Sequence, residues 1–370
     1  MVRGGRGGVG SSGMTSASEP GADGERRVAS DAAGVVVLGV CAGWSLIAAT
    51  VHDGRPEGVL LAVLAVAAGY AAGRIGGALL PVGLPFAGAL AGIGLTVAVP
   101  HLAPGPQITT PLGHAGATAA VLTLSAAAAC CAAWAAPVPA TRIALRLLAA
   151  GTAVLAAALG SATGCVTCLA VLLCSLAAGH TRHRGAGLAV LAAVAALVTG
   201  LTWAVAARAV PGGFVAALEG RLTPHRVQLW QDAWHLLRGD IVMGVGPGRF
   251  GELSATSAQS LLSDGKPHSA PLQQAAEQGT VGLALLAAAF GWMLFALWRG
   301  PRPTPVVLTA GSALTALAAI AAIGNALSFT AVSVGAGLLA GTATARPLTD
   351  EPPRHAPGTR PRGAGRAPAR

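Results

Sequence analysis

Apolar residues run along this chain in stretches of about 20 positions that contain almost no charged side chains. Such a run is typical of a transmembrane helix, because only a helix satisfies its own backbone hydrogen bonds in lipid. Ten runs are recognised, at residues 32–51, 57–73, 76–99, 115–136, 143–160, 165–179, 186–207, 279–298, 305–323 and 326–345. The pattern predicts an all-α, polytopic integral membrane protein with about ten transmembrane helices.

One long polar segment, residues 208–278, interrupts this pattern between the seventh and eighth runs. A connection of that length suggests a function rather than a simple link. Its six basic residues are offset by six acidic ones, so it is a mixed polar surface and not a basic patch. We expect one large extracytoplasmic loop here.

The two ends of the chain lack an apolar pattern. Residues 1–31 are rich in Gly, Ser and Arg, and residues 346–370 are rich in Pro, Arg and Gly, so both are expected to be disordered tails around a membrane domain at 32–345. Arg26 and Arg27 precede the first run as in a signal peptide, but that run is long and many further spans follow, which favours an anchor.

The distribution of basic residues predicts the orientation. If the ten spans alternate, 17 of the 24 Lys and Arg residues lie on the side of the two termini. By the positive-inside rule, both termini are cytoplasmic and the protein is a multi-pass protein of the plasma membrane, in contact with membrane lipids. The net charge of +10 is concentrated in the tails and short loops, so no nucleic-acid partner is expected.

The six cysteines all fall within predicted spans. Cys165 and Cys168 form a C-x-x-C pair, but no further ligands lie nearby in the sequence. We therefore interpret the cysteines as small packing residues and expect no metal site.

The stretch TPHRVQLWQDAWHLLRGD in the loop predicts a helix, with Thr223 as N-cap, Pro224 in the first turn and Gly239 at the end. Its apolar face, which carries two tryptophans, suits a helix that lies on the membrane interface or on the bundle. Arg226 borders this face, and contact with lipid headgroups is one interpretation of it.

The stretch GVGPGRF, residues 244–250, has the composition of a glycine-rich phosphate cradle. No strand precedes it, and it lies on the outer side, so a tight turn that brings Arg249 back to the membrane is the favoured interpretation.

Polar side chains gather before the eighth run. Ser269 can cap a helix that has Pro271 in its first turn, which places His268 just before the helix and Gln273 and Glu277 on one of its faces. A histidine is the natural proton acceptor near neutral pH, although a loop histidine usually has no catalytic role.

Together these residues resemble the O-antigen ligase and polymerase family. The resemblance rests on Arg226 and Trp230, the glycines of GVGPGRF, and the order His268, Glu277, Gly279, Gly282 ahead of a span. A weaker likeness to a second family segment lies in TTPLGHAGATAAVLTL, residues 109–124.

The resemblance implies a membrane glycosyltransferase of the GT-C type, which needs no metal or cofactor. It would move a glycan from a polyprenyl-diphosphate carrier to a hydroxyl acceptor, either another glycan or a cell-wall component, on the outer face. His268 would be the catalytic base and Arg226 would hold the diphosphate. The candidate substrate-binding residues are Arg226, Arg249, Lys266, Gln273 and Glu277.

The sequence also departs from the family pattern. Gly164 stands where the family has an arginine, Ser269 follows His268 where the family has asparagine, and Gly116 replaces the asparagine of the second segment. Arg208, Arg221 or Arg249 would have to replace the missing arginine. Two alternatives stay open: a non-catalytic relative that binds the lipid-linked glycan, and a membrane transporter, although the spans carry almost none of the charges that a transporter needs.

Overall fold

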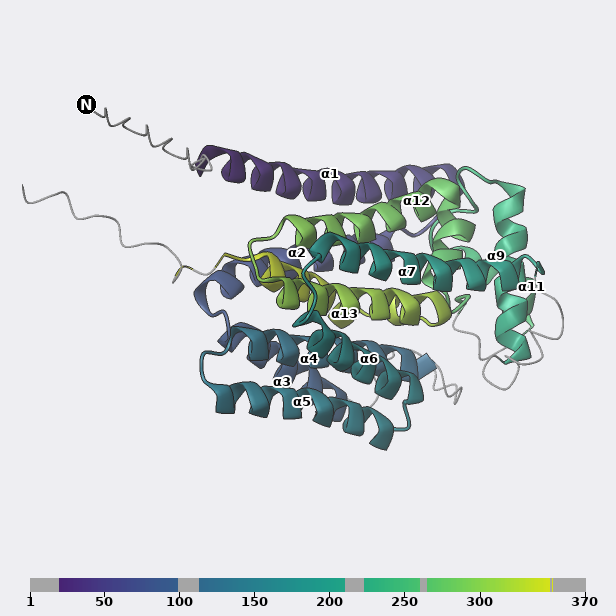
Figure 1. Ribbon diagram of the computed structural model, residues 1–370. Helices are drawn as coiled ribbons and strands as arrows, with labels where there is room; N and C mark the ends of the chain where they lie inside the picture. Colours follow the sequence, from purple (N-terminus) through teal and green to yellow (C-terminus); the bar gives the residue numbers. More distant parts are fainter. Residues whose placement is uncertain (1–19, 99–112, 210–222, 260–264, 347, 349–370) are drawn as a thin grey trace, which may run out of the picture.

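The computed structural model describes residues 20–98, 113–209, 223–259, 265–346 and 348. Ten long helices coincide with the ten predicted spans (Figure 1). They are α1 (Pro20–His52), α2 (Glu57–Leu79), α3 (Gly83–Ala98), α4 (Gly113–Ala135), α5 (Pro139–Ala158), α6 (Ala162–Ala178), α7 (Arg184–Ala206), α12 (Ala270–Arg299), α13 (Thr304–Ile323) and α14 (Thr330–Thr344).

Seven of these helices, α1, α2, α4, α5, α7, α12 and α13, are long and apolar enough to cross a membrane. The remaining three, α3, α6 and α14, are apolar but shorter, so the count of ten spans stays a prediction. The prediction of a polytopic helical membrane protein is confirmed.

Several boundaries differ from the expected ones, and two of them are informative. Helix α1 begins at Pro20, so the described part of the predicted N-terminal tail is helical. Helix α2 continues through Arg74 to Leu79, beyond the break expected at residues 73–76. The charge of Arg74 does not end the helix, because Arg74 Nη1 lies 2.8 Å from Asp31 Oδ1 on α1.

Glycines let α2 and α14 approach each other closely. A Cβ atom on Gly73 would lie 2.3 Å from the carbonyl oxygen of Leu338, and one on Gly341 would lie 2.2 Å from that of Tyr70. A Cβ atom on Gly69 or on Gly337 would likewise lie 2.3 Å from the nearest carbonyl oxygen of the other helix. Small residues at four-residue spacing are a recurrent means of helix association in membranes.

The described part of the long polar segment folds into helices at one end of the bundle. It contains α9 (Pro224–Gly239), α10 (Phe250–Leu253), α11 (Ala255–Ala258) and the first turns of α12. In Figure 1 this end lies opposite to the start of α1, and α9 runs across the direction of the long helices. We call this end, which also carries the α1–α2 link, the loop end, and the opposite end the terminal end.

Helix α9 packs on the bundle rather than lying separately at the membrane interface. Leu229, Trp230 and Ala233 are buried in one cluster with residues of α7 and α12, and Leu237 on the same helix is also buried. Trp234 is partly buried, with its ring centroid 5.3 Å from that of Trp203 on α7. The predicted helix and its Pro224 start are confirmed.

Candidate functional site

A kink in α12 organises the loop end. Gly279 has φ 67° and ψ −167°, which interrupts the helical hydrogen bonds across it. The carbonyls of the three residues before Gly279 would otherwise accept bonds from the next turn. They accept instead from the Val245 amide (2.9 Å to Ala276), the Gly246 amide (2.9 Å to Glu277) and Trp44 Nε1 (3.1 Å to Gln278). The kink thus joins α12 to α1 and to the loop.

The segment from Gly244 to Phe250, here called the glycine turn, packs between the kink in α12 and the α1–α2 link. Gly244, Gly246 and Gly248 all have positive φ. A Cβ on Gly244 would meet the Ala276 carbonyl oxygen at 2.5 Å, and a Cβ on Gly246 would meet the His52 Cβ at 2.7 Å. Because its amides bond to α12, the segment is a packed turn and not a phosphate cradle.

The Glu277 side chain is buried within this turn, with the residue 5% exposed. Its carboxylate accepts hydrogen bonds from the backbone amides of Gly248 and Phe250 and, at 3.3 Å, from Gln273 Nε2.

Arg249 projects from the glycine turn towards the α1–α2 link. Its Nη1 donates to the His52 carbonyl at 2.6 Å, and its Nε lies 3.7 Å from Glu252 Oε2. The other carboxylate oxygen of Glu252 lies 3.4 Å from Arg55 Nη2. The Arg55 amide also donates to the Pro247 carbonyl at 2.6 Å. Two guanidinium groups from distant parts of the chain therefore share one carboxylate.

Arg226 is buried at the end of α13. The residue is 5% exposed, and its Nη1 donates to the carbonyl of Ile323, the last residue of that helix, at 3.1 Å. A cation at a helix C-terminus is favourable because of the unsatisfied carbonyls there. This burial contradicts the interpretation that Arg226 extends into the lipid headgroups.

His268 lies two residues before α12 and is partly exposed. Its φ is 53°, a left-handed conformation that is uncommon outside glycine. Ser269 is the residue before the helix, as predicted, and Pro271 lies in the first turn. The Ser269 side chain, however, is 1% exposed and makes no capping hydrogen bond, so this part of the prediction is wrong.

The structure brings some of the predicted residues together. Gln273 donates to Glu277, Lys266 is near enough for its charge to act on that carboxylate, and Arg249 lies on the glycine turn that Glu277 contacts. Arg226 is held separately by α13. The sequence interpretation missed Arg55 and His52, because a short link between two spans carries no signal of what it contacts.

The packing around Gly164 is tight. A Cβ at this position would lie 3.1 Å from the Ala119 Cα and 3.2 Å from the Ala156 Cβ, so a larger residue would require these neighbours to shift. Of the three arginines considered in its place, Arg208 donates from Nη2 to Gln231 Oε1 at 2.7 Å, and Arg221 lies outside the described residues.

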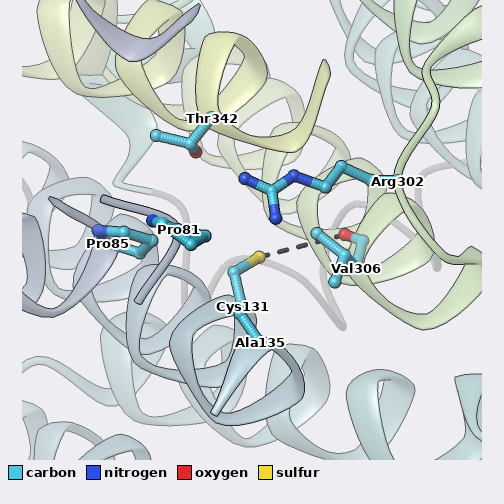
Figure 2. Close-up of a pocket in the computed structure, with 7 residues that line it drawn as sticks. All are labelled: Pro81, Pro85, Cys131, Ala135, Arg302, Val306 and Thr342. Atoms are coloured by element: carbon cyan, nitrogen blue, oxygen red, sulfur yellow. Dashed lines mark hydrogen bonds between the residues drawn. The ribbon is translucent and has the colours of Figure 1, made fainter. Parts of the chain in front are cut away.

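A small cavity lies at the terminal end, away from these residues. Its lining is Pro81, Pro85, Cys131, Ala135, Arg302, Val306 and Thr342, and the Arg302 guanidinium points into it between α4 and α14 (Figure 2). Its volume of about 10 Å³ suits no more than about one water molecule, so it does not accommodate a diphosphate.

The comparisons with known proteins agree with the resemblance. Residues 144–287 match the family model described as O-Antigen ligase. Searches of curated proteins and of solved structures found no match. The matched range contains α9, the glycine turn, His268 and the kink of α12. The chain is therefore a multi-pass membrane protein that is similar to the O-antigen ligase family over residues 144–287, less than half of its length.

Proposed function

We propose that this protein transfers a glycan from a polyprenyl-diphosphate carrier to a hydroxyl group of a second glycan or a cell-wall component, at the loop end of the bundle. The observation that carries the proposal is the position of the signature residues. They lie within the range matched by the family model, and α9, the glycine turn and α12 pack together there.

In the proposed reaction, the acceptor oxygen attacks the anomeric carbon of the glycan. The new C–O bond forms as the bond to the diphosphate breaks, and the polyprenyl diphosphate leaves with that electron pair. His268 takes the proton of the acceptor hydroxyl. Arg226 and Arg249 bind the diphosphate oxygens, because a guanidinium presents two parallel N–H donors to an oxyanion. Lys266 and Gln273 line the acceptor side.

Arg226→Lys tests this proposal. A lysine retains the charge but cannot offer the forked pair of donors, so we expect about a tenfold or greater loss of transfer. Accumulation of the polyprenyl-diphosphate-linked glycan in cells that carry only the variant measures the loss. The matched control is Arg238→Lys on the exposed part of the same helix, which should transfer normally. Full activity of Arg226→Lys would argue against diphosphate binding by this residue.

The proposal requires the loop end to face outwards. In a variant without the natural cysteines, a cysteine at the exposed Gln259 should react with a membrane-impermeant thiol reagent on intact cells. A cysteine at the exposed Thr181, between α6 and α7, should react only after the membrane is opened. The reverse pattern would place the loop end in the cytoplasm, where the proposed reaction does not occur.

One observation favours a second candidate, a non-catalytic relative that binds the lipid-linked glycan. Gly164 stands in tight packing at the position where catalytic relatives are expected to carry an arginine. The two candidates differ in the phenotype of cells that lack the protein. Loss of a transferase causes the lipid-linked glycan to accumulate, whereas loss of a binding protein does not.

A further inference from the structure

The residues on both sides of Arg249 are held by one carboxylate. The amides of Gly248 and Phe250 both donate to the Glu277 side chain. The Phe250 amide belongs to the peptide group that follows Arg249, and the Gly248 amide belongs to the one that precedes Gly248. Bonds at both places restrain the backbone on the two sides of Arg249, and therefore the direction in which its side chain leaves the backbone.

The main chain of Glu277 holds the same turn. Its carbonyl accepts the Gly246 amide at 2.9 Å, and this carbonyl is available only because of the kink at Gly279. Glu277 thus contacts the glycine turn at three amides, one through its backbone and two through its side chain.

The partners of this carboxylate belong to the protein. Glu277 is 5% exposed, and its side chain accepts from two backbone amides and from Gln273. A carboxylate buried in this way is costly unless each oxygen is bonded, so these donors account for its presence. Arg249, by contrast, has a partly exposed side chain that reaches His52 and Glu252.

We propose that Glu277 is a positioning residue that acts through Arg249, by fixing the glycine turn from which Arg249 reaches the diphosphate. The inference rests on the proposed function, because it assumes that Arg249 binds the donor. It assigns Glu277 to the support of the site rather than to direct contact with substrate.

The test is a double-mutant cycle with Glu277→Gln and Arg249→Gln. Glutamine has the shape of glutamate, but its NH₂ group would face one of the two amide donors. We expect each single variant to raise the KM for the lipid-linked donor by roughly tenfold to a hundredfold, the range for a hydrogen bond to a charged group. The double variant should be no worse than Arg249→Gln alone, because both changes remove the same interaction. Glu57→Gln, an exposed carboxylate at the start of α2, is the control.

Three results would overturn the inference: normal transfer by Glu277→Gln, losses that multiply in the double variant, or normal transfer by Arg249→Gln. If Glu277→Gln does not accumulate in the membrane, Glu277→Asp replaces it in the cycle. The aspartate keeps the charge, but its shorter side chain cannot reach both amides. Glu277→Asp should therefore lower transfer in the natural protein and cause no further decrease in the Arg249→Gln variant. The proposed function fails separately, if Arg226→Lys and His268→Ala both transfer normally.

Discussion

Replacing His268 by alanine is expected to slow glycan transfer by about 10²–10⁴-fold, the contribution of a general base to such a reaction. The acceptor hydroxyl has a pKa far above neutrality, so its attack on the anomeric carbon depends on a nearby group that removes the proton. The variant should still be present in the membrane at the normal level and should still bind the lipid-linked donor. Transfer is measured as the fraction of glycan that leaves the carrier.

Two companion variants separate catalysis from local folding. His268 has a φ of 53°, which alanine adopts at a cost, whereas asparagine tolerates this conformation and has no basic nitrogen. His268→Asn should therefore lose transfer as His268→Ala does. His225→Ala, at an exposed position of α9, should be unaffected. Normal transfer by His268→Asn would remove the catalytic assignment.

Gly279→Ala should abolish most transfer and lower the melting temperature of the protein. A Cβ on Gly279 would lie 2.0 Å from the Val242 carbonyl oxygen, and the combination of φ 67° and ψ −167° is essentially confined to glycine and costs other residues roughly 1–3 kcal/mol. Alanine favours a straight helix, in which the carbonyls of residues 276–278 would again bond within α12. The Val245 and Gly246 amides of the glycine turn would then lose the α12 carbonyls to which they donate.

The control for this variant lies in the same helix. A Cβ on Gly291 would meet nothing within 4 Å, so Gly291→Ala should preserve both transfer and thermal stability. Thermal unfolding in detergent and protease cleavage near residues 244–250 measure the two effects. A Gly279→Ala protein with an unchanged melting temperature and a protected turn would show that the kink does not hold the loop end together.

The features that the sequence predicted are local ones. Apolar runs predict spans because the thickness of the hydrocarbon layer sets their length, and Pro224 predicts the start of α9 because proline fits the first helical turn. Gln273 and Glu277 are four residues apart on one helix, and they do interact. The likeness to the O-antigen ligase family also came from residues close together in the sequence, and the family model confirms it.

The features that were missed depend on contacts between distant segments. Nothing near Arg55 in the sequence indicates that it shares Glu252 with Arg249. The Ser269 hydroxyl was expected to cap α12, but its burial directs it away from the amides of the first turn. Gly279 was recognised only as part of a motif, and its backbone conformation became apparent only from the packing against Val242.

The close glycine contact between α2 and α14 has a consequence for biosynthesis. The ribosome delivers α2 early, and its partner is the last of the long helices to emerge. Until α14 emerges, its backbone cannot pack against Gly69 and Gly73, and lipid chains do not approach these glycines as closely as that backbone does. Insertion of the individual helices and assembly of the bundle are therefore separate in time. The bundle closes only after α14 has been translated.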